Sequence, residues 1–250
     1  MGFLDVGGGL GIDYDGSRTA SSASTNYSLQ NYANDVVATI RECCVPLEVP
    51  VPTLVSESGR ALASHFSVLV FNVLGCSRAP DGEPAQQSDE PLPVANLRET
   101  LQRIRQMDPA DPSLLQEAWN DAIKFREDAL AAFRLGYIRL SQRAMAEQLS
   151  WTCAKEISSR LPTDEPIHED LRGLQRALAW TYYANLSIFR SAPDTWAIDQ
   201  LFPVMPIHRL NECPSELGQF ADLTCDSDGK LSRFIDRGSD CLLYTSDAAD

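Results

Sequence analysis

The feature that most constrains this chain lies near its start, where FLDVGGGLGIDYDG places three consecutive glycines directly after a short apolar segment. FLDV predicts a short buried strand. A loop that only has to reach positive φ explains one or two glycines, but not three in succession. The dinucleotide fingerprint fails because Gly7 and Gly9 fit its first two positions while the third falls on Ile12. The Walker pattern fails too, because no Gly-Lys-Ser/Thr follows. What remains is a backbone cup whose amide N–H groups converge on an anion such as a phosphate.

The residues around this loop have an α/β pattern. The stretch 28–44 predicts a helix that Ser28 caps, and PTLVSES (52–58) predicts a second strand. HFSVLVFNVLG (65–75) is rich in β-branched and aromatic residues, so it predicts a third strand. In a (β/α)₈ barrel, phosphate cups form in the loops after the late strands, at the C-terminal face. The helix expected over 28–44 has an apolar stripe that consists of Tyr32, Val36, Val37 and Ile40.

A helical block and a strand-like region follow. Residues 77–93 hold prolines and acidic residues with almost nothing apolar, which predicts an exposed linker. NLRETLQRIRQM then predicts a helix, with Leu97, Leu101 and Ile104 on one face. Further along the chain we expect a long helix that Ser113 caps and that reaches about Leu161, a third helix over roughly 166–189, and short strands from Pro193 onward.

Composition excludes several classes of protein. The formal charge of −14 makes a nucleic-acid surface unfavourable, because phosphate binding needs clustered Lys and Arg. Seven cysteines without regular spacing predict neither a disulfide framework nor a zinc site, and favour a reduced, cytoplasmic compartment. No apolar run approaches 18 residues and no charged leader precedes an apolar core, so we expect a soluble protein without a membrane partner.

Two more motifs carry polar side chains. SESGRA (56–61) follows the second expected strand, which places Glu57 and Arg60 at the same end of the sheet as the glycine loop. The two side chains either form a structural ion pair, or Arg60 binds an anion while Glu57 faces a cationic ring nitrogen. LTCDSDGKL (223–231) resembles half a calcium loop, but the remaining ligands are absent. A turn with a buried thiol is the alternative.

Four ordered stretches over residues 3–240 resemble the biosynthetic arginine decarboxylases, pyridoxal 5′-phosphate (PLP) enzymes built like alanine racemase and eukaryotic ornithine decarboxylase. The stretches are LDVGGGLGIDYDGS, SESGRALASHFSVLVFNVLG, DTWAIDQLFPVMPIHRLNE and LTCDSDGKL. The resemblance implies an α/β plus β fold, with the C-terminal part of a PLP-binding (β/α)₈ barrel, a helical-bundle insertion and part of a β-domain. The implied parts are barrel strands (1–64), a strand entering the β-domain (65–76), an acidic linker (77–94), the helical insertion (95–190) and part of the β-domain (191–240). Residues 241–250 resemble a translated sequencing-adapter tail.

The resemblance also implies roles for individual residues. Gly7, Gly8 and Gly9 match the loop that binds the phosphate of PLP, and Arg60 matches its phosphate-side arginine. Glu57 matches the carboxylate paired with the pyridinium nitrogen, which keeps the ring an electron acceptor as CO₂ leaves. The resemblance assigns no metal-ligating residue. Magnesium is expected from the resemblance alone.

The remaining implied roles concern the substrate. Cys225 matches a catalytic cysteine contributed across a dimer interface, near the Cα that is reprotonated, so a homodimer-based oligomer is expected. Asp226 matches the acidic residue that meets the substrate's guanidinium. A loop expected to contact substrate runs from residue 4 to residue 14 and includes Leu4, Asp5, Leu10, Gly11, Asp13 and Tyr14.

The chain departs from the family in the residues expected upstream of the glycine loop, since the family's stacking histidine is missing as well as its Schiff-base lysine. The family's Schiff-base lysine lies on the first barrel strand, upstream of the glycine loop, and Lys124, Lys155 and Lys230 do not match that context. We therefore expect an internal fragment, inactive alone, of an enzyme that converts L-arginine to agmatine and CO₂ in polyamine biosynthesis. Two alternatives stay open: a sister decarboxylase of ornithine, lysine or diaminopimelate, and a non-catalytic homologue that lacks the lysine.

Overall fold

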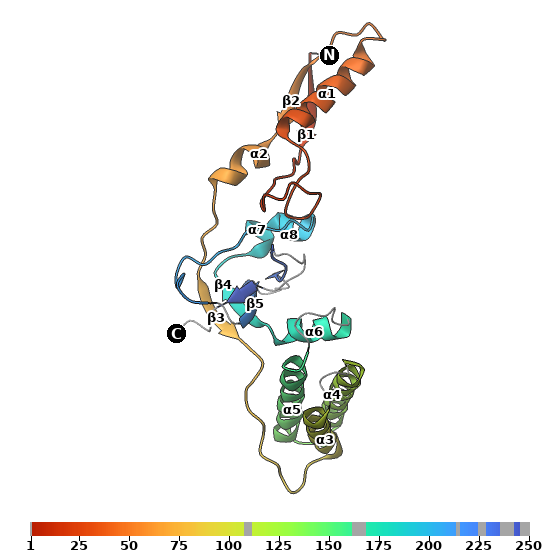
Figure 1. Ribbon diagram of the computed structural model, residues 1–250, viewed down its shortest axis with the longest axis vertical. Coiled ribbons are helices and arrows are strands. Elements are labelled where there is room, and N and C mark those ends of the chain that lie inside the picture. Colours follow the sequence, from red (N-terminus) through yellow and green to blue (C-terminus); the bar gives the residue numbers. More distant parts are fainter. Residues whose placement is uncertain are drawn as a thin grey trace. The chain divides into compact units, whose positions relative to one another are not determined.

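The computed structural model describes residues 2–107, 112–161, 169–213, 216–224, 229–235 and 243–245. Figure 1 draws the elements along the chain. The chain divides into two compact units, and each is described by itself. The first comprises Met1–Gly75, Tyr182–Pro214 and Gln219–Asp250, and the second comprises Cys76–Thr181 and Ser215–Gly218.

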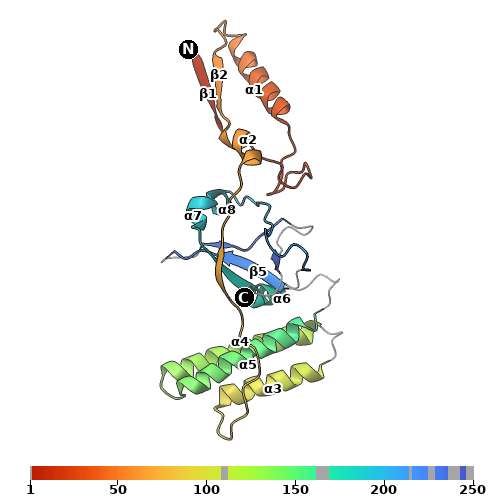
Figure 2. The same ribbon diagram turned by 90° about the vertical axis from the view of Figure 1, so that its left-hand side faces the viewer.

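The first unit begins with the expected α/β arrangement, but its first strand is not buried as predicted, because Phe3 is 72% exposed and the strand belongs to a two-stranded sheet. Strand β1 (Phe3–Gly8) pairs in parallel with β2 (Thr53–Glu57), and helix α1 (Leu29–Cys44) connects them and runs alongside the strand pair (Figures 1 and 2). The register aligns Phe3 with Thr53 and, after an irregularity, Gly8 with Glu57. The predicted cap of α1 is confirmed, because Ser28 Oγ accepts a hydrogen bond from Asn31 N at 3.1 Å.

The predicted strand over 65–75 is largely wrong. Residues 59–66 form the short helices α2 (Gly59–Ala63) and η1 (Ser64–Phe66), and only β3 (Val73–Ser77) is a strand. Phe66 and Val68 are each 88% exposed. β-propensity reflects packing against neighbouring strands, so an apolar segment without such packing does not become a strand.

The second unit is built around a helical bundle. Helices α3 (Leu92–Gln106), α4 (Pro112–Arg134) and α5 (Leu140–Ser158) lie side by side in both views (Figures 1 and 2), and α6 (Glu169–Leu178) adds to the same core. The predicted apolar face of α3 is confirmed, since Leu97, Leu101 and Ile104 are fully buried. No helix within the described ranges is both long and apolar enough to cross a lipid bilayer.

The long helix expected to reach Leu161 is two helices. Gly136, at φ +78°, reverses the chain between α4 and α5, and its N–H donates to Phe133 O at 3.0 Å. Tyr137 N donates to Ala132 O at 2.9 Å. This is a left-handed glycine cap, in which carbonyls at the helix end gain partners. Ser113 lies inside the first turn of α4 rather than before it.

The third expected helix also ends early. Residues 162–168 lie outside the described residues, α6 ends at Leu178, and β4 (Trp180–Ala184) and α7 (Ile188–Ser191) follow. Tyr182, which falls inside the predicted helix over roughly 166–189, lies in β4, whose residues alternate between buried and half-buried. That period of two belongs to a strand, and its aromatic and Thr residues favour one.

The remaining strands form one sheet with β3 and β4. Its order is β3, β4, β5 (Glu216–Ala221) and β6 (Lys230–Leu231), and β7 (Leu243–Thr245) pairs with β5. The expectation of strands after Pro193 is confirmed for this part of the chain, but Pro193–Ala197 forms the short helix α8, with its proline in the first turn. The strands concerned are β5, β6 and β7, the last within the expected adapter-like tail.

The acidic linker is mostly exposed, as predicted, but it is held on the bundle. Arg98 on α3 donates from Nη2 to Glu90 at 2.6 Å and from Nε at 3.0 Å, and both side chains are under 10% exposed. Lys155 on α5 donates to the carbonyl of Pro80 at 2.9 Å. Gln148 donates to the carbonyl of Asp81 at 3.1 Å. The linker is thereby part of the second unit.

Candidate functional site

Parallel pairing of β1 and β2 brings the glycine loop and the Glu57 segment to the same end of the strand pair, as predicted. Gly8 lies opposite Glu57. A Cβ atom on Gly8 would lie 2.2 Å from the backbone oxygen of Glu57. That distance is far inside van der Waals contact. The middle glycine is therefore required by the close approach of the two strands.

The outer glycines of the loop have a different role. Gly7 and Gly9 have φ of +79° and +76°, and no heavy atom lies within 4 Å of the position of a Cβ on either residue. Gly7 N donates to Asp5 Oδ1 at 2.8 Å. Among the described residues, no group accepts a hydrogen bond from the N–H of Leu10. The loop thus presents an open, donor-bearing side, although Asp5 already occupies the amide of Gly7.

Arg60 connects the loop to a distant segment. Its Nη2 donates to Asp194 Oδ2 at 2.7 Å, and its Nη1 donates to the carbonyl of Leu10 at 3.3 Å. Within the part of the chain that the structure describes, Arg60 pairs with Asp194 and not with Glu57. The intramotif ion pair considered from the sequence is therefore not formed, and the Glu57 side chain is exposed at the strand end.

Tyr14 lies beside this ion pair. Its ring packs edge-on against Phe202, with ring centroids 5.4 Å apart, and its N–H donates to Ala23 O at 2.9 Å. Burial raises the pKa of the Tyr14 phenol, the charge of Arg60 opposes that rise, and the charge of Asp194 adds to it. The phenol is therefore neutral at physiological pH and retains the proton with which it can donate a hydrogen bond.

The other residues predicted to contact substrate are used within the loop itself. Leu10 is buried, and Gly11 N donates to the Tyr27 hydroxyl at 2.7 Å. Asp13 Oδ1 accepts from Ser24 Oγ at 2.6 Å. Leu4 is half-buried and is the second residue of β1. Their roles toward a substrate stay predictions, and the structure assigns them local packing and hydrogen bonds.

Cys225 and Asp226 lie outside the described residues, which end at Thr224 and resume at Gly229. Hydrogen bonds of Asp222 connect the residues on the two sides of this segment. Asp222 is buried, accepts a hydrogen bond from Thr224 Oγ1 at 2.9 Å, and donates through its N–H to Gly229 O at 3.0 Å. The structure thus describes the two ends of the Cys-Asp segment only.

Sequence reasoning missed three polar residues near the loop. Asp194 is the partner of Arg60, and Thr195 follows it directly. The buried Thr195 Oγ1 has no hydrogen-bond partner among the described residues, and the Ser64 side chain interacts with the Tyr14 phenol. A signal existed for all three, because Asp194 and Thr195 open the stretch DTWAIDQLFPVMPIHRLNE and Ser64 lies in SESGRALASHFSVLVFNVLG. Both stretches contributed to the resemblance, but these three residues were given no role.

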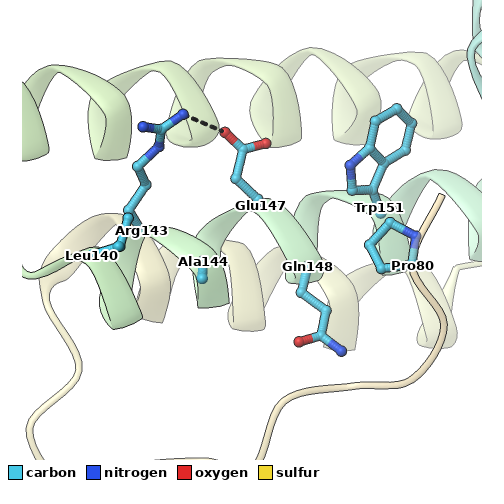
Figure 3. A pocket seen from close by; sticks show the side chains of 7 residues that line it. All are labelled: Pro80, Leu140, Arg143, Ala144, Glu147, Gln148 and Trp151. Atoms are coloured by element: carbon cyan, nitrogen blue, oxygen red, sulfur yellow. Dashed lines mark ion pairs between the residues drawn. The ribbon is translucent and has the colours of Figure 1, made fainter.

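The second unit carries a shallow depression of about 500 Å³, seen in Figure 3. Arg143 and Glu147 in its wall pair with each other at 3.9 Å, and the Arg143 guanidinium lies 5.2 Å from the centre of the Phe133 ring. The two charges therefore satisfy each other. No group of three metal-ligating side chains occurs within the described ranges. The depression is lined by Pro80, Leu140, Arg143, Ala144, Glu147, Gln148 and Trp151.

Two family models match the chain. Residues 1–64 match the pyridoxal binding domain of pyridoxal-dependent decarboxylases, and residues 87–175 match the arginine decarboxylase helical bundle domain. The chain is 68% identical over 241 residues to a biosynthetic arginine decarboxylase of Prochlorococcus marinus strain MIT 9303, covering 95% of this chain and 37% of that protein. It is 69% identical, with the same coverage, to the biosynthetic arginine decarboxylase of Parasynechococcus marenigrum strain WH8102.

A solved structure is also similar. The crystal structure of the biosynthetic arginine decarboxylase of Campylobacter jejuni matches with a TM-score of 0.70 and 29% sequence identity, over 100% of this chain and 38% of that one. The chain therefore spans little more than a third of the length of its relatives.

Proposed function

This chain belongs to the family of biosynthetic arginine decarboxylases, and from that premise we propose that the protein containing it converts L-arginine to agmatine and CO₂ with pyridoxal 5′-phosphate as cofactor. The observation that carries the proposal is the succession, in one chain, of a pyridoxal-binding domain and the helical bundle domain of arginine decarboxylases. A sister decarboxylase is less well supported, because the bundle match is specific to the arginine enzymes.

The residues present fit the cofactor. The loop offers open space at Gly7 and Gly9 and the unbonded N–H group of Leu10, which suit a phosphate. The buried, unpartnered Thr195 Oγ1 lies next to the residue that holds Arg60. An orphaned buried hydroxyl is costly unless a ligand satisfies it.

When bound, PLP supplies a protonated pyridine ring that accepts the electron pair left behind as CO₂ departs. Glu57 holds the proton at the ring nitrogen, and Arg60 and the glycine loop bind the phosphate. Asp226 binds the substrate guanidinium through charge-assisted hydrogen bonds. Cys225 returns a proton to the substrate Cα. These assignments rest on the resemblance of the motifs.

Covalent attachment of the cofactor needs a desolvated lysine directed at it, and we assign that lysine to a part of the protein outside residues 1–250. Lys155 is bound to the acidic linker through the carbonyls of Ala79 and Pro80. Borohydride reduction of the 250-residue chain after incubation with PLP, followed by mass spectrometry, is expected to leave no stoichiometric adduct on Lys124, Lys155 or Lys230. One such adduct would contradict the assignment.

The test of the proposed function uses the full-length enzyme. Glu57→Gln is expected to lower turnover of arginine severely while PLP still binds, because a neutral amide does not hold the ring nitrogen protonated. Glu42→Gln is the matched control, since Glu42 is exposed on α1. Near-normal turnover in Glu57→Gln would refute its role. Preference of the unaltered enzyme for ornithine, lysine or diaminopimelate over arginine would refute the substrate.

We further propose that the enzyme works as a homodimer-based oligomer in the cytoplasm and serves polyamine biosynthesis. A cysteine contributed across the dimer interface requires at least two subunits. Light scattering of the full-length enzyme tests this, and a monomer at the concentrations used for activity would contradict it. Magnesium and the division into domains at 64, 76, 94, 190 and 240 stay predictions of the resemblance.

A further inference from the structure

The guanidinium of Arg60 is fixed from two sides by segments that lie far apart in the sequence. Asp194 accepts from Nη2 at 2.7 Å, and the carbonyl of Leu10 accepts from Nη1 at 3.3 Å. The Arg60 side chain is 22% exposed. A guanidinium carries five N–H donors, and these two contacts use two of them. Three donors are left, which is enough for a bidentate contact to an anion.

The segment that carries Asp194 is itself anchored in the first unit. Asp194 O accepts hydrogen bonds from the N–H groups of Ile198 and Gln200 at 3.2 and 3.0 Å. Gln200 Nε2 donates to Ser22 O at 2.6 Å, and Leu201 N donates to the same oxygen at 2.9 Å. These bonds fix the segment against the loop that continues from the glycine loop. Asp194 is therefore a rigid support rather than a freely moving carboxylate.

We propose that Asp194 is a positioning residue for the phosphate site: it holds the Arg60 guanidinium against the glycine loop so that the remaining N–H groups meet the cofactor phosphate. The proposal rests on the proposed function, because it takes the anion to be the phosphate of PLP. Asp194 does not touch that phosphate, since two anions in contact would repel each other. It acts through Arg60 alone. Because the ion pair already holds the Arg60 side chain in one conformation, less side-chain entropy is lost when the phosphate binds.

A purely structural role for the ion pair predicts something different. If Asp194 only ties α8 to the loop, its removal weakens the fold and affects every ligand of the site equally. If it positions Arg60 for phosphate, its removal affects ligands that carry phosphate and spares those that lack it. Pyridoxal and PLP differ only in that group, so the pair of ligands separates the two roles.

The experiment measures dissociation constants of PLP and of pyridoxal for the cofactor-free, full-length enzyme by absorbance titration. Asp194→Asn is expected to weaken PLP about tenfold, the scale of one charge-assisted hydrogen bond, and to change pyridoxal affinity by less than about twofold. Asp194→Glu is expected to recover part of the loss. Asp199→Asn is the matched control, because Asp199 lies on the same segment and pairs with Arg233 instead.

Three results would overturn the positioning role: equal losses for PLP and pyridoxal, no loss for PLP, or the full Asp194→Asn effect persisting in an Arg60→Gln background. The double variant keeps the test decisive if Asp194→Asn lowers thermal stability. If Asp194 acts through Arg60, adding Asp194→Asn to Arg60→Gln causes no further loss of PLP affinity. If one of these results is obtained and the unaltered enzyme decarboxylates arginine, only the role of Asp194 is refuted. Unaltered enzyme that binds no PLP refutes the proposed function as well.

Discussion

Replacing Gly8 with alanine tests whether the close approach of β1 and β2 builds the site. The new Cβ would lie 2.2 Å from the backbone oxygen of Glu57 and 3.1 Å from its carbonyl carbon. Both atoms belong to the backbone, so no side chain can rotate away. Contact at an ordinary separation requires the strand ends to move apart by about 1 Å.

Such a backbone shift costs about 1–3 kcal/mol of stability. The larger consequence is functional, because Glu57 is the residue displaced and Arg60 follows three positions later. A misplacement of about 1 Å in a catalytic arrangement can reduce the rate about a hundredfold. We therefore expect Gly8→Ala to lower turnover far more than the loss of stability alone explains.

The assay compares turnover of arginine, PLP affinity and urea denaturation in the full-length enzyme. Gly59→Ala is the matched control, since Gly59 lies two residues after Glu57 with no positive φ and nothing within 4 Å of its Cβ position. Gly7→Ala separates steric clash from backbone strain, because its new Cβ would lie in open space while φ is +79°. We expect this variant to lower the free energy of unfolding by about 1 kcal/mol. If Gly8→Ala matched Gly59→Ala in turnover and stability, the reasoning from the strand contact would be refuted.

Three further predictions concern substrate binding, acid stability and thiol reactivity. Asp226→Asn in the full-length enzyme is expected to raise the KM for arginine about ten- to a hundredfold by removing a charge-assisted contact; an unchanged KM would contradict the substrate role. Glu90→Gln is expected to destabilise the bundle by about 2 kcal/mol in urea denaturation at pH 7. Because hydrogen bonding from Arg98 lowers the folded-state pKa of Glu90, the stabilisation is present above the ordinary value of 4.5 and is lost as the pH falls below it, so a Gln variant as acid-sensitive as the unaltered enzyme would argue against the pair. Burial raises the pKa of Cys153 to about 12, so this thiol is expected to resist a disulfide reagent at pH 8 until the protein unfolds, whereas the exposed Cys43 reacts at once; mass mapping showing early Cys153 modification would contradict its burial.

Several parts of the protein could be predicted from the sequence because they depend on neighbours along the chain. The capped helix α1 and the buried face of α3 follow from residue spacing, which the 3.6-residue period converts directly into a face. The glycine loop and Glu57 could be placed together, because consecutive strands joined by a helix pair in parallel and end at the same edge. The four ordered motifs identified the family for the same reason: each is a short local signature.

The sequence misled where packing competes with local preference. Residues 67–72 are strongly β-forming and yet stay outside any strand, because a strand needs a neighbour to accept its hydrogen bonds. The sequence predicts a helix over the aromatic run that forms β4, because short apolar segments satisfy either period. In both cases the packing of the segment against the rest of the fold, rather than its local preference, decided whether it became a strand.

Only the tertiary structure decided the surroundings of Arg60. Its partner Asp194 lies 134 residues away, and no spacing rule connects the two positions. The clash that requires glycine at Gly8 is likewise a contact between backbones of different strands. Such contacts exist only once the chain has brought distant segments together, because the free energy that selects them comes from burial and hydrogen bonding between those segments rather than from either segment alone.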